Sequence, residues 1–203
     1  MRSKSTTARF QLYDHVYYWP MYLNITHQVA YDDSAVAVFS LSKMAGLASS
    51  RVGWVITSNT QVAAFIRRWS MITHISQPIQ SHMIAALSIE HIISSGGLIF
   101  EEMRAILHSR CSELLAAVSA SKSWLVSTNL LSSTTGLLSS PPYAWLRNTV
   151  SANAEEILMK AQIKVSPGRG YGMTDSSYVR ISMVVPTRDF DLFLHKFKAS
   201  FAS

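Results

Sequence analysis

The chain has 203 residues, of which 48% are hydrophobic and 15% are charged, and this composition excludes a disordered chain. The net charge is +6, but the basic residues are scattered and only Arg67 and Arg68 are adjacent, which argues against a nucleic-acid-binding protein. The single cysteine, Cys111, excludes an internal disulfide and a zinc site built from cysteines. The histidines show no metal-ligand spacing, so we expect no metal site.

The sequence contains no apolar run of about 18 residues, so we expect no transmembrane helix and no membrane partner. Residues 1–9 are basic and rich in hydroxyl groups, but no apolar segment follows them, so we expect no secretory signal. These two observations favour a cytoplasmic protein.

The first third of the chain predicts a small sheet and one helix. A strand ends at Asp14, and the apolar runs 35–39 and 52–56 predict two further strands separated by a turn. Polar residues at 58–60 provide an N-cap for a helix over about 61–70.

Two long helices are predicted next. One begins at Pro78, runs through Ile93 and ends at two glycines. Apolar residues recur at helical spacing across 98–118 and predict the second helix. We expect this helix pair to join two domains.

The last third of the chain predicts a small α/β domain. Serine, threonine and asparagine dominate residues 119–140, which give no clear signal of secondary structure apart from the apolar run Trp124–Val126. The predicted elements are a strand at 143–146, a helix at 154–162, a strand leading into a turn at 163–168, a strand at 178–184 and a helix at 188–199 with Thr187 as its N-cap.

Lys43 lies in the turn between two predicted strands. Ser40 precedes it by three residues, and Arg51 follows it by eight. A lysine after a strand is most often a solvated surface residue. A lysine among hydroxyl groups and small residues, with an arginine nearby to hold phosphate, is instead typical of a lysine that forms a Schiff base with pyridoxal phosphate. The pattern therefore predicts that Lys43 carries this cofactor and is the catalytic residue.

The other groups that such an enzyme needs also have candidates. An acid must keep the pyridine nitrogen protonated, and Asp14 at a strand end is the candidate, with Tyr17 placed to reach the ring hydroxyl. Ser40 and Arg51 are the candidates for the phosphate, and Arg180 for the substrate carboxylate. Each candidate also has an ordinary structural explanation. Asp14 could be an acid in a loop, and Tyr17 a packed ring. Ser40 and Arg51 could be turn residues, and Arg180 an arginine on an edge strand.

The sequence resembles a known family in several segments. The pattern Ser40-x-x-Lys43-x-x-Gly46-x-x-x-x-Arg51-x-Gly53 resembles the lysine motif of fold-type I aminotransferases. Four segments are similar to segments of the plant alliinase and tryptophan aminotransferase-related family: Asp14–Pro20, Phe39–Lys43 with Gly53 and Trp54, Pro142–Trp145, and Tyr178–Ser182.

This resemblance implies a two-domain pyridoxal phosphate enzyme that forms a homodimer and acts on an amino acid and a 2-oxo acid. Two reactions are open: transamination of an aromatic amino acid, such as tryptophan on the way to auxin, or alliinase-type β-elimination from an S-alkyl cysteine sulfoxide. Nothing in Lys43 or its neighbours separates them. A third possibility is a truncated, non-catalytic remnant.

The resemblance also implies that about 150 or more residues precede the Asp14 segment in relatives, so this chain matches their C-terminal portion. We therefore predict an α/β fold that comprises a partial, mostly parallel large domain and a small C-terminal domain. The predicted segments are 1–75 for the large-domain part with the Schiff-base lysine, 76–118 for the connecting helices and 119–203 for the small domain.

Overall fold

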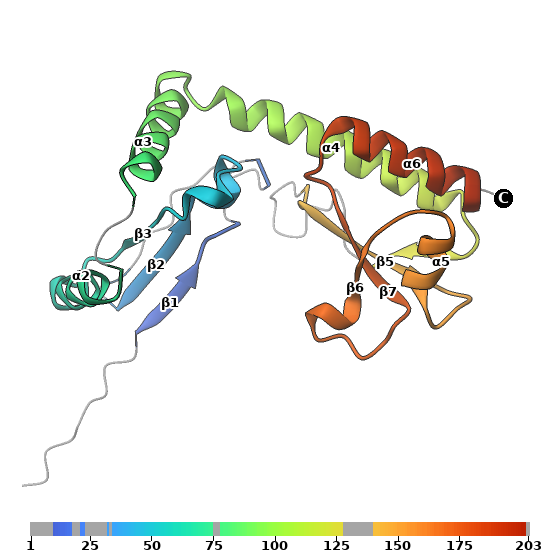
Figure 1. The fold of residues 1–203 in the computed structure, drawn as a ribbon, viewed down its shortest axis with the longest axis horizontal. Helices are drawn as coiled ribbons and strands as arrows, with labels where there is room; N and C mark the ends of the chain where they lie inside the picture. Colours follow the sequence, from blue (N-terminus) through green and yellow to red (C-terminus); the bar gives the residue numbers. More distant parts are fainter. Residues whose placement is uncertain are drawn as a thin grey trace, which may run out of the picture. The chain divides into compact units, whose positions relative to one another are not determined.

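The computed structural model of the protein describes residues 10–17, 21–22, 32, 34–74, 78–127 and 140–201. The chain divides into two compact units, drawn in Figure 1. Unit 1 comprises Met1–Trp19 and Ile25–Ile99, and unit 2 comprises Pro20–Asn24 and Phe100–Ser203. The three predicted segments remain a prediction.

Unit 1 contains a three-stranded sheet of β1 (Gln11–Asp14), β2 (Ala35–Ser40) and β3 (Gly53–Ile56), in the order β1-β2-β3. β1 runs parallel to β2, and β3 runs antiparallel to it. Along β2, Ala35 and Ala37 are buried while the residues between them are half-buried, which is the alternation expected of a strand with one covered face.

The helices of unit 1 are α1 (Leu41–Met44), the 3₁₀ turn η1 (Ala48–Ser50), α2 (Thr60–His74) and α3 (Ile79–Ser94). The predicted N-cap of α2 is confirmed at Asn59. Its Oδ1 accepts hydrogen bonds from the backbone N–H groups of Gln61 and Val62, at 3.1 and 3.0 Å, so two donors of the first turn are satisfied.

Unit 2 contains a four-stranded antiparallel sheet in the order β4-β5-β7-β6. Its elements are α4 (Leu98–Ser119, which begins at the end of unit 1), β4 (Trp124–Val126), β5 (Tyr143–Asn148), α5 (Ala154–Lys160), β6 (Ser166–Pro167), the 3₁₀ turn η2 (Gly168–Tyr171), β7 (Tyr178–Ser182) and α6 (Thr187–Phe201). One face of the sheet is apolar and buried, through Ala144, Leu146, Val179 and Ile181.

α6 contributes several large side chains to the unit 2 core. Its apolar residues recur at helical spacing, and Phe190, Leu194 and Phe197 are buried. Phe197 has no exposed surface, and its ring lies 5.9 Å from that of buried Trp124.

Arg110 fastens α4 to the start of α6. This arginine is buried, and its Nη1 donates to the backbone oxygens of Met183 and Val185, at 2.7 and 2.8 Å. Its Nη2 donates to the hydroxyl of Thr187 at 3.1 Å. Thr187, which we predicted as an N-cap, is the first residue of α6, and its hydroxyl accepts from Arg110. Carbonyl dipoles thus satisfy a buried charge.

One predicted strand is shorter in the structure, and one strand of the structure was not predicted. Within the segment 163–168, predicted as a strand leading into a turn, β6 covers only Ser166–Pro167, because only these residues pair with β7. β4 was not predicted, because it pairs with β5 from within a segment of polar composition. Residues 18–20 of the segment Asp14–Pro20, and residues 128–139 of the segment without a clear signal, lie outside the described residues.

Across the described residues, no single helix is long and apolar enough to cross a membrane. Among these residues, only α3 and α4 taken together, as a pair bent by 87°, reach the length and apolar composition of a membrane span. The same residues contain no cluster of three or more histidine, cysteine or acidic side chains that could hold a metal ion.

Candidate active site

Five of the predicted site residues gather at one edge of the unit 1 sheet. The parallel register pairs Asp14 with Val38, so β1 ends beside the end of β2. β3 runs in the opposite direction, so its first residue, Gly53, pairs with the last residue of β2, Ser40. The carboxyl ends of β1 and β2 and the entry to β3 therefore share an edge, which is where α/β sheets bind ligands.

Lys43 stands on a short helix that begins where β2 ends. Ser40 caps this helix, since its Oγ accepts from the backbone N–H of Ser42 at 3.2 Å. Leu41 and Met44 are buried and hold α1 in place, and the backbone N–H of Leu41 donates to Val52 at 3.0 Å. Lys43 lies half-buried between the two anchors.

Asp14 and Tyr17 lie at the end of β1. The carboxylate of Asp14 accepts from the backbone N–H of Val16 at 3.1 Å, which fixes its place at the strand end. The Nζ of Lys43 lies 5.6 Å from the centroid of the Tyr17 ring, within the range of a cation–π contact. The structure thus brings Lys43 and Tyr17 together.

The backbone at Gly53 explains why a glycine follows the turn. A Cβ at this position would lie 2.7 Å from the backbone oxygen of Phe39 in β2, so any other residue would push β2 and β3 apart. Arg51, two residues earlier, has a left-handed backbone with φ of 55°, and its exposed guanidinium donates to Ala48 O at 3.2 Å. This bond uses one of the N–H donors of the Arg51 guanidinium.

A row of aromatic rings crosses the sheet behind this edge. The ring of Phe39 stacks on that of Trp54 at 5.7 Å and lies 5.3 Å from that of His15, which in turn stacks on Tyr13 at 5.9 Å. The row joins all three strands and supports the edge. Trp54 of β3 is the ring of this row that packs against Phe39.

Arg180 lies in unit 2, on the half-exposed face of the sheet. It is in the middle of β7, paired with Trp145 of β5 and Ser166 of β6. Its Cζ lies 4.1 Å from the ring centroid of Tyr143 and 4.0 Å from that of Tyr171. The sequence did not indicate the contacts of Arg180 with Tyr143 and Tyr171, because the three residues lie on three different elements, β7, β5 and η2.

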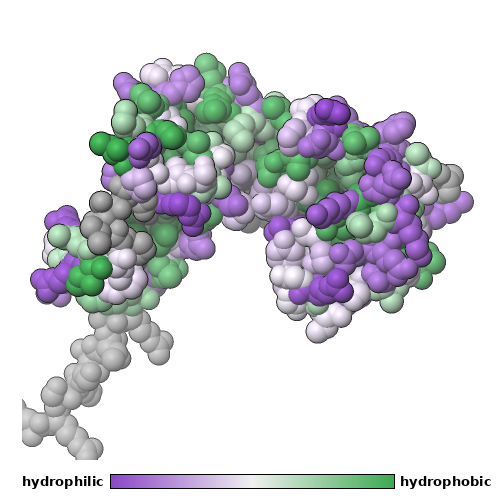
Figure 2. All heavy atoms as spheres, in the orientation of Figure 1, coloured by the Kyte–Doolittle hydropathy of each residue, from purple (hydrophilic) through white to green (hydrophobic). Residues whose placement is uncertain are grey.

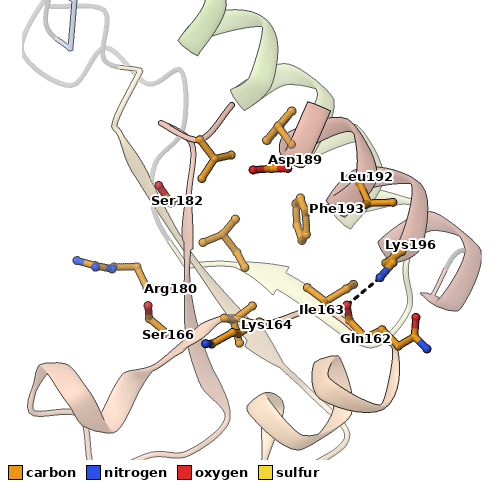
Figure 3. Close-up of a pocket in the computed structure, with 14 residues that line it drawn as sticks. Gln162, Ile163, Lys164, Ser166, Arg180, Ser182, Asp189, Leu192, Phe193 and Lys196 are labelled. Atoms are coloured by element: carbon orange, nitrogen blue, oxygen red, sulfur yellow. Dashed lines mark hydrogen bonds between the residues drawn. The ribbon is translucent and has the colours of Figure 1, made fainter. Parts of the chain in front are cut away.

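A cavity of about 500 Å³ lies at the outer edge of the unit 2 sheet, between α6 and residues 162–166. Figure 3 shows the Phe193 ring on one side of this cavity and the Arg180 side chain directed away from it. The Nζ of Lys196 donates to the backbone oxygen of Gln162 at 3.0 Å, which ties α6 to the cavity wall. Arg180 therefore presents its charge outside this cavity.

The sequence is similar to those of several aminotransferases. The family model described as allinase matches residues 3–201. "Tryptophan aminotransferase-related protein 4" of Arabidopsis thaliana is 29% identical over 191 residues, which are 89% of this chain and 40% of that protein. "LL-diaminopimelate aminotransferase" of Dehalococcoides mccartyi strain CBDB1 is 28% identical over 161 residues, which are 76% of this chain and 37% of that protein.

The fold is that of pyridoxal phosphate enzymes. A PLP-dependent aminotransferase from Streptococcus suis superimposes with a TM-score of 0.68 at 21% identity, over 94% of this chain and 48% of that one. The predicted α/β class and partial fold are confirmed. The chain spans less than half the length of these proteins. The family and its structural neighbours imply pyridoxal phosphate as the cofactor.

The residues at the unit 1 edge fit this cofactor. Lys43 supplies an amine, Asp14 supplies a carboxylate, and Ser40 and Arg51 supply donors for a phosphate, all at the edge of one sheet. The close approach at Gly53, two residues after Arg51, holds the start of β3 against Ser40 at the end of β2. With the family match over residues 3–201, these features show that the chain belongs to the allinase family.

Proposed function

We propose that this chain supplies the lysine-bearing part of a pyridoxal phosphate-dependent aminotransferase that converts an aromatic, tryptophan-type amino acid to its 2-oxo acid. The observation that carries the proposal is the gathering of Lys43, Ser40, Arg51 and Asp14 at one edge of the unit 1 sheet. The names of the plant relatives support the aromatic substrate. The homodimer is part of the same proposal.

Each residue at the edge has a distinct role in this proposal. Lys43 attaches the cofactor, and its released amine then carries the proton from the α-carbon of the substrate. The short, anchored helix α1 keeps this amine in place. Asp14 pairs with the ring nitrogen, and Tyr17, whose ring faces the Lys43 amine, contacts the ring hydroxyl. Ser40 and Arg51 hold the phosphate, because hydroxyl and guanidinium groups suit a dianion.

The cofactor and unit 2 supply the remaining functions. Pyridoxal phosphate, when bound, supplies the conjugated ring that accepts electrons as the α-proton leaves. Arg180 binds the carboxylate of the amino acid. Its guanidinium is flanked by two tyrosine rings, so its N–H edge is the part left to meet a planar anion.

The test is covalent capture of the cofactor. The purified chain is incubated with pyridoxal phosphate and reduced with borohydride, and the phosphopyridoxyl group is located by mass spectrometry. We expect the label on Lys43, and its loss in Lys43→Ala. Lys160→Ala is the matched control, since Lys160 is exposed and paired with Glu156 at 2.9 Å. Uniform labelling of surface lysines would contradict the proposal.

A second reaction is favoured by the description of the family as allinase. β-Elimination uses the same lysine and differs in the leaving group on the substrate Cβ. Incubation with tryptophan and a 2-oxo acid should yield indole-3-pyruvate if the chain is a transaminase. Incubation with an S-alkyl cysteine sulfoxide should yield pyruvate and ammonia if it is a lyase. Labelling of Lys43 without either product would identify a non-catalytic remnant that retains the cofactor site.

A further inference from the structure

Arg110 of α4 and Arg180 of β7 are held in different ways. Arg110 is buried, and its guanidinium is occupied by Met183, Val185 and Thr187. Arg180 is half-exposed and contacts two aromatic rings, and among the residues that the structure describes it forms neither a hydrogen bond nor an ion pair. The fold therefore uses the donors of Arg110 and leaves those of Arg180 for a ligand.

The rings of Tyr143 and Tyr171 flank the Arg180 guanidinium. Both centroids lie about as close to its Cζ as stacked planar groups allow, 4.1 and 4.0 Å, well inside the usual limit of roughly 6 Å for cation–π contacts. The two rings come from separate elements, β5 and the turn η2. Because the five N–H bonds of a guanidinium lie in its plane, contacts to its faces leave those donors directed outward.

Each ring is fixed by a separate part of unit 2. Tyr143 is the first residue of β5 and pairs with Ser182, so it lies diagonally across from Arg180 on the same face of the sheet. Tyr171 ends η2, and the edge of the Trp145 ring meets it at 5.5 Å and 84°. The turn is itself held tightly, since a Cβ on Gly168 would lie 3.0 Å from Tyr178 O.

We propose that Tyr143 and Tyr171 are positioning residues that hold the Arg180 guanidinium in one orientation for a ligand carboxylate. This inference rests on the proposed carboxylate role of Arg180. A solvated arginine has many rotamers and loses them when it binds, whereas a flanked guanidinium has already lost them. Removal of one ring should therefore weaken carboxylate binding about 3- to 10-fold, as expected for one side chain that must be ordered on binding.

The test compares loss of the ring with loss of the hydroxyl alone. Tyr171→Leu removes the ring, and Tyr171→Phe keeps it. The probe is indole-3-propionate, an aromatic carboxylate without the amine that would react with the cofactor, and its uncharged amide is the ligand control. Affinity is measured by titration on the full chain, and the Arg180 Nε–H resonance, assigned with Arg180→Lys, reports rotation of the guanidinium by NMR.

Three results distinguish this inference from the proposed function. The inference predicts weaker binding of the acid and faster guanidinium rotation in Tyr171→Leu, values close to those of the parent in Tyr171→Phe, and no change for the amide. If Arg180→Met abolishes binding but neither Tyr171→Leu nor Tyr143→Leu alters it, the positioning role is wrong and the carboxylate role stands. If Arg180→Met binds the acid as well as the parent, both are wrong.

Discussion

The sheets of the two units differ in what covers them. In unit 2, the inner face of the sheet packs against the aromatic residues of α6, and Leu146, Val179 and Phe197 have no exposed surface. In unit 1, large apolar side chains remain at the surface on a strand and on a helix, where Leu12 of β1 is 72% exposed and Ile72 of α2 is 74% exposed. Figure 2 shows hydrophobic residues gathered on the visible face of α3.

This difference separates the part of the chain that makes a core from the part that carries Lys43. Among its described residues, unit 2 buries most of its large apolar side chains, as a domain with its own core does, although some, such as Val150, remain exposed. Unit 1 aligns a lysine, an acid and phosphate donors at a sheet edge, but it leaves apolar surface of the kind that soluble proteins normally bury. That is the pattern expected for part of a larger domain, and the chain spans 40% of the Arabidopsis relative.

The largest effect predicted from this comparison is on stability. Phe197→Ala should lower the free energy of unfolding by about 3–5 kcal/mol, because it opens a cavity beside the rings of Trp124 and Phe201. The matched change in unit 1, Phe65→Ala, should alter it by less than about 0.5 kcal/mol, because Phe65 is 68% exposed. Urea unfolding followed by circular dichroism measures both. Equal losses would show that the units are equally well packed.

The parts of the site that depend on local spacing could be predicted from the sequence. Ser40 and Lys43 were identified because a hydroxyl and a lysine three residues apart, in a turn after a strand, suit a phosphate donor and a Schiff-base lysine, and these roles stay predictions. Asn59 was identified because a helix needs an N-cap, whereas the cap that Ser40 provides for α1 was not predicted. The parallel pairing of β1 and β2 could not be derived from periodicity, since it joins strands separated by about twenty residues.

The parts that depend on tertiary contact were missed. Tyr171 carries no motif, and its role follows only from the placement of η2 against β7. β4 lies in a segment of polar composition and forms because β5 offers it a partner, as strand propensity is set mainly by packing context. The exposure of α2 was not predicted either, because its hydrophobic periodicity is the same whether or not a neighbour covers it.

A second prediction concerns the close backbone approach in unit 1. Gly53→Ala should cost about 1–3 kcal/mol, because the added Cβ would lie 2.7 Å from Phe39 O and would force β2 and β3 apart. It should also reduce labelling of Lys43 by pyridoxal phosphate, since Gly53 pairs with Ser40. Gly170→Ala in unit 2 is the control, because nothing lies within 4 Å of its added Cβ. Unchanged labelling in Gly53→Ala would mean that the edge tolerates the shift.

The smallest effect concerns the one cysteine, which reports on the closure of the unit 2 core. Cys111 has no exposed surface, and burial raises the pKa of its thiol from 9.0 to about 11. A disulfide reagent at pH 8 should therefore label it only when unit 2 opens. Ile72→Cys in a Cys111→Ala background places a thiol at a site that is 74% exposed, and it should react at once.

The same thiol predicts how stability changes in alkali. Between pH 9.0 and about 11 the unfolded chain releases the thiol proton while the folded chain retains it. The stabilising contribution of Cys111 is thus fully present below pH 9.0 and declines as the pH rises toward 11. Urea midpoints measured across this interval should fall more steeply in the parent than in Cys111→Ala, which lacks the group. Parallel slopes, or rapid labelling of the native parent, would show that the core of unit 2 is open to solvent.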